Sequence, residues 1–459
     1  MMERRITALL LVLIAALLLA SAAQADVLQR DKQWNGHGSK SPDLRSQNAK
    51  LLGTAPNPFE INSDLAFWGD LAFAGDFGGF RVIDISAPAN PKVVADVDCV
   101  GPQNDVSVWG NLLFLSVDAV MTGSGCDSDF AEDPTAPGGW EGIRIFDVSN
   151  PADPRFVTGV ETDCGSHTNT LIPDPANGRV LLYVLSYALT SGPHCGPEAF
   201  AAGRADSPLH EKFSIVEVPL SAPGDAAVIA EPGIAAPLFD LGFPGLNPTI
   251  GCHDATVFLE LRLAAVACLS DAQLWDITDP ENPASMAAIH ISNPDVEIWH
   301  SATFTWDGKV IVFGDESESG SCSSPSERDG RLWFYSRANP PSVLGSFMIP
   351  RPQPAIEYCS AHLFNVIPGV RGYLLASSWY EGGTDIVDFT DPANAREVGY
   401  YDAQAPIPSV VWSAYWYNGF VYANDIIRGF DVFRFSDSAL AGGSRVPYLN
   451  PQTQSSLIR

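Results

Sequence analysis

The sequence predicts an all-β fold built from repeated four-stranded units, and three observations lead to this prediction. One segment recurs five times as an apolar run, a turn that contains proline and a second apolar run, at residues 80–95, 143–158, 273–288, 331–346 and 384–399. A further apolar hairpin lies upstream of each copy. The 39 Gly and 36 Pro fall between these short runs, as is typical of strands joined by turns.

Each copy of the repeat has its own turn chemistry. The two prolines of the turn exclude a helix. At the exit of the preceding strand, a short acidic side chain can accept hydrogen bonds from N–H groups of the turn backbone. This position is occupied by Asp84, Asp147, Asp276 and Asp388. We therefore interpret these four carboxylates as structural, not catalytic.

The upstream hairpins complete a unit of four strands. They span residues 63–77, 104–119, 252–272, 299–317, 361–379 and 412–426, and a divergent seventh unit runs through residues 166–187 and 213–230. Asp307-Gly308 and Asn418-Gly419 are typical two-residue turns of such hairpins. Four strands that recur at intervals of roughly 45 to 70 residues predict a seven-bladed β-propeller with antiparallel blades.

The last blade runs out of apolar sequence at Phe435, after its third strand. We expect residues 48–56 to supply the missing outer strand, because an N-terminal strand that completes the C-terminal blade closes the ring and leaves no open sheet edge. The predicted propeller therefore spans residues 48–435. An N-terminal extension at residues 26–47 precedes it, and a polar C-terminal tail at residues 436–459 follows it.

Residues 1–25 have the pattern of a cleaved secretory signal peptide, in which Arg4 and Arg5 precede an apolar run and small residues follow it. We therefore expect a secreted monomer, extracellular or periplasmic, with no transmembrane segment in the mature chain. The net charge of −28 disfavours nucleic acid as a partner. A small ligand or an extracellular protein remains as the expected partner.

The eight cysteines of an exported chain predict disulfide bonds. In a propeller blade the first strand starts at the face where the second strand ends, so cysteines at these two places can meet. This geometry pairs Cys252 with Cys268, Cys99 with Cys126 and Cys164 with Cys195. Cys322 and Cys359 remain, and we expect them to form the fourth disulfide.

Alignment of the seven first strands gives a column of polar residues at their entry ends, Asp64, Asp105, His167, His253, His300, His362 and Ser413. First strands line the central channel of a propeller, so these side chains are expected around one mouth of the channel. Imidazole is a common ligand of Zn, Cu, Fe and Ni. The four histidines, from four consecutive blades, are therefore candidate ligands of a divalent transition metal. The alternative is that they only form hydrogen bonds with neighbouring strand ends.

Acidic residues near the column are candidates for proton transfer or for orientation of an imidazole. Asp315 is expected opposite His300 across the Asp307-Gly308 turn, with Glu316 beside it, and Asp105 belongs to the column itself. His194 and His210 lie in a long insertion in the third blade. One interpretation is that this insertion covers the channel mouth, and the one that we favour is a mobile surface loop.

The strand motifs at residues 81–85 and 385–389 resemble those of the LVIVD-repeat proteins, which are exported propellers. Residues 252–259, 299–305 and 412–420 look like more specific marks of one bacterial branch. The resemblance implies a propeller over nearly all of the mature chain, and it implies no particular activity. A ring of four propeller histidines is also similar to the metal centre of carotenoid oxygenases, whose sequence motif this chain lacks.

Three functions are consistent with these patterns. The first is binding of a divalent metal or a small ligand at the channel mouth by His167, His253, His300 and His362. The second is a metal-dependent oxidase or hydrolase at the same place, with Asp315 or Asp105 handling protons. The third is an extracellular scaffold that binds another protein through its rim loops without catalysis.

Overall fold

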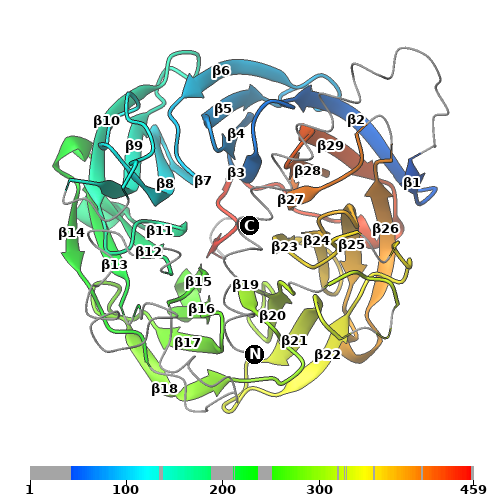
Figure 1. The fold of residues 1–459 in the computed structure, drawn as a ribbon. Helices are drawn as coiled ribbons and strands as arrows, with labels where there is room; N and C mark the ends of the chain where they lie inside the picture. The colour runs from blue at the N-terminus through cyan, green and yellow to red at the C-terminus, as the bar shows by residue number, and fades with distance from the viewer. Residues whose placement is uncertain are drawn as a thin grey trace.

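Seven sheets form a closed ring around a central channel, which confirms the predicted seven-bladed β-propeller (Figure 1). The computed structural model describes residues 43–133, 138–187, 210, 212–235, 251–317, 320–324, 326, 328–354, 357–404 and 407–455, and only the backbone of residues 284–289. The predicted signal peptide at residues 1–25, residues 26–42 of the extension, His194 and Cys195 lie outside the described residues.

Each blade has four antiparallel strands, and in six blades they follow one another along the chain. The first blade contains β3 (Asn62–Trp68), β4 (Leu71–Asp76), β5 (Gly79–Asp84) and β6 (Lys92–Asp98), and the second contains β7 (Gln103–Trp109), β8 (Leu112–Met121), β9 (Trp140–Asp147) and β10 (Arg155–Glu161). The third blade contains β11 (Thr168–Asp174), β12 (Arg179–Leu185), β13 (Ser214–Pro219) and β14 (Ala227–Ala230). The fourth blade contains β15 (Asp254–Phe258), β16 (Leu263–Ala267), β17 (Ala272–Asp276) and β18 (Ala284–Ile291).

The fifth and sixth blades contain β19 (Trp299–Phe304), β20 (Val310–Asp315), β21 (Leu332–Ser336) and β22 (Val343–Phe347); β23 (Phe364–Val366), β24 (Leu374–Ser378), β25 (Thr384–Asp388) and β26 (Arg396–Asp402). The described residues also form five short 3-10 helices, η1 (Pro175–Asn177), η2 (Pro223–Asp225), η3 (Leu259–Leu261), η4 (Pro392–Asn394) and η5 (Ser438–Leu440). None of the helices in the described part of the chain is long and apolar enough to cross a membrane.

The seventh blade joins the two ends of the ring. Its strands are β27 (Val411–Tyr417), β28 (Phe420–Asp425) and β29 (Gly429–Phe435), and its outer strand is β2 (Ala49–Pro56). β2 pairs antiparallel with β29, with Ala49 opposite Phe435 and Pro56 opposite Gly429 (Figure 1). β1 (Leu44–Arg45) adds a fifth strand to the sixth blade by pairing with β26. The N-terminal strand therefore covers the edge that three strands alone would expose.

The predicted turn chemistry is confirmed. The Oδ1 atom of each of the four aspartates accepts a hydrogen bond from the backbone N–H two residues further on, at 2.8 to 3.0 Å, in Asp84, Asp147, Asp276 and Asp388. These bonds hold the turn between the third and fourth strands of four blades. The four carboxylates are thus structural, as their place in the repeat indicates.

The apolar core lies between neighbouring blades. Phe73 of the first blade and Val108 of the second belong to one buried cluster. The rings of Phe334 and Phe389 stack with centroids 4.8 Å apart between the fifth and sixth blades. The two neighbouring blades cover the two faces of each sheet, so the inner strands are apolar on both faces. The polar side chains at the strand ends are the ones that line the mouth of the channel.

Residues 436–459 were expected to be a polar tail, but the C-terminal segment, residues 448–455, lies inside the central channel (Figure 1). β30 (Tyr448–Leu449) pairs antiparallel with β3, and β31 (Thr453–Gln454) pairs parallel with β15. The Asn450 side chain bonds to both the N–H and the C=O of Val108, at 2.8 and 2.9 Å. Gln454 does the same with Phe304. The segment therefore satisfies backbone groups on the free inner edges of several first strands.

Three predicted disulfides are confirmed, and they are Cys99–Cys126, Cys252–Cys268 and Cys322–Cys359. Cys164 is also disulfide-bonded. Its predicted partner, Cys195, lies outside the described residues. Two of the confirmed bonds involve a cysteine that closely precedes a column histidine, since Cys252 adjoins His253 and Cys359 lies three residues before His362.

Candidate metal centre at the channel mouth

The four predicted histidines lie together at one mouth of the channel. His167 and His253 immediately precede β11 and β15, His300 is the second residue of β19, and His362 lies two residues before β23. All four therefore stand at the entry ends of first strands. Their side chains are almost fully enclosed, with exposed fractions of 1 to 5%.

The imidazoles form a continuous row across the four blades. The Nε2 atoms of His167 and His253 lie 2.7 Å apart. The ring centroids of His253 and His300 are separated by 3.7 Å, and those of His300 and His362 by 4.3 Å. No sequence motif links these residues, so ring closure alone brings them together.

Hydroxyl groups beside the histidines hold the blades in register at this level. Thr168 Oγ1 donates a hydrogen bond of 2.7 Å to the His253 carbonyl, and Ser301 Oγ donates one of 2.7 Å to the His362 carbonyl. His300 itself is the extra residue of a β-bulge, because Trp299 pairs with Asp315 whereas Ser301 pairs with Gly314. A bulge re-aims one side chain without breaking the strand, and here the re-aimed side chain is that of His300.

Oxygen acceptors orient the two outer imidazoles of the row. His167 Nδ1 lies 2.7 Å from Asp118 Oδ2, and His362 Nδ1 bonds to the carbonyl of Trp412. An N–H on Nδ1 leaves the lone pair on Nε2, which is the usual arrangement of a histidine that binds a metal. Among the described residues, the Nδ1 atoms of His253 and His300 make no hydrogen bond of good geometry, and backbone groups of His300 and His362 lie beside these two rings.

Glu316 brings a carboxylate to the same row. Its Oε2 lies 3.4 Å from His300 Nε2, and its Oε1 lies 3.8 Å from His362 Nε2. The Tyr380 hydroxyl donates a hydrogen bond of 2.5 Å to Oε1. Potential ligand atoms of His253, His300 and Glu316 all lie within 4.8 Å of one another, a spacing that suits one metal ion.

Burial keeps three of the four imidazoles uncharged. Burial, together with the neighbouring imidazoles, lowers the pKa of His253 and of His300 well below the ordinary value. Burial lowers the pKa of His362 to about 3. These imidazoles are therefore neutral at physiological pH, which is the form that binds a metal.

A second ring of side chains overlies the histidines, and the sequence analysis did not find it as a ring. Its members directly follow the second strands or lie near their ends, and they include Asp118, Tyr187, Glu316 and Tyr380. The Tyr187 ring packs on His167 with centroids 4.7 Å apart, and the Tyr380 ring packs on His362 at 4.6 Å. In every blade the end of the second strand lies opposite the start of the first strand. An alignment of the ends of the second strands would therefore have identified these four residues from the sequence.

Asp105 lies one layer deeper than its place in the predicted column. β3 and β7 each contain an extra residue, in bulges between Asn62 and Leu65 and between Gln103 and Val106. Asp105 Oδ2 consequently accepts hydrogen bonds from the backbone and side chain of Asn169, two residues beyond His167.

Two other aspartates share this deeper layer. Asp64 accepts a hydrogen bond of 2.6 Å from Tyr415, two residues beyond Ser413. Burial and then Asp64 raise the pKa of Asp105 well above its ordinary value, and Asp254 adds to the effect. These three carboxylates form a buried layer between the histidine row and the C-terminal segment.

Asp315 does not face His300, because the bulge at His300 places Asp315 opposite Trp299. Its Oδ1 accepts hydrogen bonds of 3.0 Å from the N–H groups of Glu297 and Ile298, and its Oδ2 accepts one of 2.9 Å from Gly330. The Asp315 carboxylate, which was expected to orient His300, therefore accepts hydrogen bonds from three backbone N–H groups instead. Glu316, one residue further on, is the acid that reaches the imidazole row.

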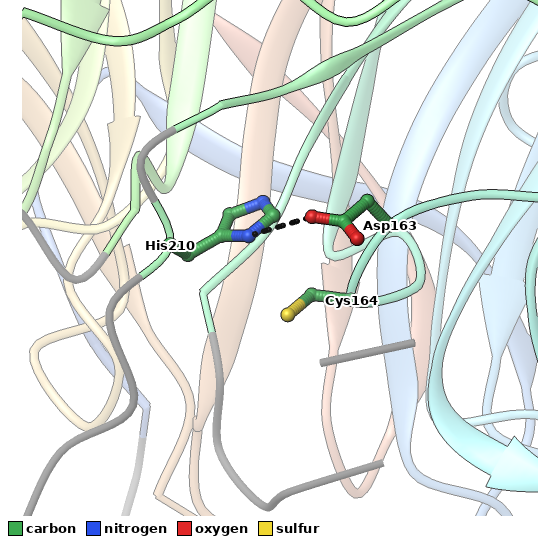
Figure 2. Close-up of side chains that lie close together, drawn as sticks. All are labelled: Asp163, Cys164 and His210. Atoms are coloured by element: carbon green, nitrogen blue, oxygen red, sulfur yellow. Dashed lines mark ion pairs between the residues drawn. The ribbon is translucent and has the colours of Figure 1, made fainter. Parts of the chain in front are cut away.

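A separate cluster lies beside the row in the third blade, where His210 faces the Asp163 carboxylate and Cys164 lies next to both (Figure 2). His210 Nδ1 is 3.3 Å from Asp163 Oδ2, and Ser186 Oγ is 3.3 Å from His210 Nε2. His210 is only 2% exposed, so its assignment to a surface loop is wrong. Because Cys164 is disulfide-bonded, its sulfur is not a thiolate ligand.

Fold and site together define the class of this protein, a β-propeller with a row of histidines at one mouth of its channel. The LVIVD-repeat family model matches residues 62–99, which form the first blade, and residues 138–162, which carry the two outer strands of the second. The first two blades of the chain therefore contain LVIVD repeats. Among curated proteins, none matches it significantly.

Two solved structures show similarity to this chain. Kuenenia stuttgartiensis hydrazine synthase is 11% identical, with 81% of this chain and 93% of that chain covered, at a TM-score of 0.51. Chaetomium thermophilum Sqt1, solved bound to the N-terminus of the ribosomal protein L10, is 13% identical, with 83% and 89% covered, at a TM-score of 0.43. At such identities the similarity concerns the fold alone.

Proposed function

We propose that this protein binds a divalent transition metal through His167, His253, His300 and His362, with Glu316 as an additional oxygen donor. The observation that carries the proposal is the contact of 2.7 Å between the Nε2 atoms of His167 and His253. This distance is shorter than twice a usual metal–imidazole bond of about 2.1 Å, so one ion can bind both nitrogens. Imidazole nitrogens with one carboxylate suit Zn, Cu, Fe or Ni.

The contacts around the row support a binding role over a purely structural one. Asp118 and the Trp412 carbonyl hold two Nδ1 atoms and direct the Nε2 lone pairs inward. Neutral imidazoles beside a carboxylate are ready for a cation.

We also propose that the protein acts outside the cytosol. Its three described disulfides support this, because such bonds persist in oxidising compartments. Two of these disulfides involve Cys252 and Cys359, which closely precede His253 and His362 in the sequence. They therefore also restrain the starts of two strands that carry proposed ligands.

The test is the metal content of protein purified without a histidine tag and dialysed against each candidate metal in turn. We expect near-stoichiometric metal in the wild type and a loss of most of it in His253→Ala and His300→Ala. His290→Ala is the matched control, because His290 is a buried histidine that pairs with Asp271 in the fourth blade, away from the row. Trace metal in the wild type, or equal content in all variants, would overturn the proposal.

A further inference from the structure

The histidine row is closed on one side and approachable on the other. Towards the interior, Gln452 of the C-terminal segment reaches Asp64, and Thr453 Oγ1 donates a hydrogen bond to the Leu171 carbonyl, so the protein's own chain occupies the channel. Towards the outside, Glu316 keeps 23% of its side chain exposed, and Tyr187 is partly exposed. A small molecule would therefore reach the Nε2 atoms past Glu316 and Tyr187.

Tyr187 covers the contact between the first two histidines. Its ring lies 4.7 Å from the ring of His167, and at 5.6 Å it is nearly parallel to the ring of His253, with 24° between the planes. Its hydroxyl lies 3.5 Å from His167 Nε2. The hydroxyl is therefore placed to donate a hydrogen bond at the first two histidines of the row.

Tyr380 occupies a similar place at the other end of the row, but its hydroxyl is already used. The O–H donates to Glu316 Oε1, and the ring packs between His362 and Tyr358, with centroid distances of 4.6 and 4.7 Å. The Tyr380 backbone has a φ of +46°, a left-handed conformation that is unfavourable for a tyrosine and aims its ring at the row. Tyr380 thus positions Glu316, whereas the Tyr187 hydroxyl, among the described residues, contacts His167 Nε2.

Metal binding would change the partners of Tyr187. The His167 Nε2 lone pair that faces the phenol is the lone pair that a metal would use. The Tyr187 O–H would then lose its acceptor on His167, and a bound molecule that supplies another acceptor would restore a hydrogen bond. The vacated acceptor position lies beside Nε2 of His167, on the approachable side of the row.

We propose that the metal centre takes a small anion that accepts a hydrogen bond, such as a carboxylate, and that the Tyr187 hydroxyl donates to this anion. The inference rests on the proposed function, because the anion is held by the metal and by Tyr187 together. Tyr187 is then a specificity-determining residue, which favours ligands with an acceptor atom next to the metal-bound atom. The ligand enters from the mouth of the channel and does not pass through it.

The experiment uses the Co(II)-loaded full chain, titrated with azide and with acetate, and follows the visible absorption of Co(II). We expect both anions to change the spectrum of the wild type and Tyr187→Phe to bind them roughly ten-fold more weakly at unchanged Co(II) affinity. Tyr183→Phe is the matched control, since it removes a buried phenol of the same blade that donates to the Pro280 carbonyl and not to the row, and its anion affinity should change by less than about three-fold.

The possible outcomes separate this inference from the proposed function. Equal anion affinities of Tyr187→Phe and the wild type, or no spectral change with either anion, would overturn the role of Tyr187 while leaving the metal centre intact. A chain that takes up no Co(II) overturns the metal centre itself, and the inference falls with it. A loss of Co(II) affinity in Tyr187→Phe would make Tyr187 part of the metal site and would also contradict the inference.

Discussion

The Nε2 atoms of His167 and His253 lie 2.7 Å apart, although 86 residues separate the two in sequence and each belongs to a different blade. Two such nitrogens cannot both carry a proton at this distance, so at least one lone pair faces its neighbour. The other ends of the two rings differ, since Asp118 binds His167 Nδ1 whereas no described carboxylate binds His253 Nδ1. This asymmetry makes Asp118 the group that sets the tautomer of the pair.

Asp118→Asn should therefore weaken metal binding. The substitution keeps the shape of the side chain but removes the charge that holds His167 Nδ1–H, and loss of such a partner usually lowers metal affinity 10- to 100-fold, so we expect a decrease of about that size. The measurement is a competition titration with a chelator. Asp163→Asn is the control, because Asp163 pairs with His210 and not with the row. Equal affinities of Asp118→Asn and the wild type would show that Asp118 does not orient a ligand.

The C-terminal segment should contribute strongly to stability through Asn450. Asn450→Ala removes both hydrogen bonds to Val108 and leaves a buried N–H and a buried C=O without partners, which should lower the free energy of unfolding by about 2–4 kcal/mol. Urea denaturation measures this change. Asn394→Ala removes an exposed hydrogen bond to Asp391 and should change stability by less than about 0.5 kcal/mol. Similar values for the two variants would contradict a structural role of the segment.

The stability of the metal-free protein should fall as the pH rises from about 4.5 to about 8. Burial, and then nearby carboxylates, raise the pKa of Glu141 from 4.5 to about 8, and burial raises the pKa of Asp425 to about 7. A carboxyl whose folded pKa is raised binds its proton more tightly in the folded state. Its contribution is thus fully present below the unfolded pKa and is lost as the pH rises through the folded pKa.

Glu141→Gln tests this dependence directly. Glu141 is 4% exposed, and its Oε1 has no hydrogen-bond partner among the described residues. A neutral amide at this position should therefore remove part of the loss of stability, by up to about 1.4 kcal/mol per pH unit between the unfolded and the folded pKa of Glu141. Thermal melting from about pH 6 to about pH 9 gives the slope. Glu132→Gln, at an exposed position, should leave the slope unchanged. A wild-type slope in Glu141→Gln would show that Glu141 is ionised throughout.

The Cys252–Cys268 disulfide should affect both stability and the metal centre. It links the residue before His253 to the end of the neighbouring strand, across a sequence separation of 16 residues. Replacing both cysteines by serine should lower the free energy of unfolding by about 3 kcal/mol and weaken metal binding, because the start of β15 becomes less restrained. The double serine variant of Cys99 and Cys126 should also lose stability but keep its metal affinity. Unchanged metal affinity in both variants would contradict the link to His253.

Much of the fold could be predicted because each blade repeats the same local chemistry. Asp84 and Asp147 bind their turns through bonds between residues two positions apart, and Asp307-Gly308 sets a hairpin, so short-range sequence is sufficient for these elements. The four histidines could be aligned for the same reason. Their common place relative to the first strand put them at one mouth once the ring was assumed.

The parts that could not be predicted depend on a shift of one residue or on distant contacts. The bulge at His300 moves Asp315 away from the row and brings Glu316 to it, and the bulge in β7 moves Asp105 to the deeper layer. A bulge changes the face of every side chain beyond it, yet it leaves only a weak mark in the sequence. The path of the C-terminal segment depends on inner strand edges that do not exist until the ring has closed.

The sequence by itself determined the repeated strands, their turns, the order of the blades and the presence of one histidine at the same point in four of them, because these follow from interactions between residues close together in the chain. Only the tertiary structure decided which acids join the histidines, that Tyr187 covers His167, and that Asn450 and Gln454 lie in the channel. Those contacts join separate blades, so they arise from the closure of the ring and the register of each strand.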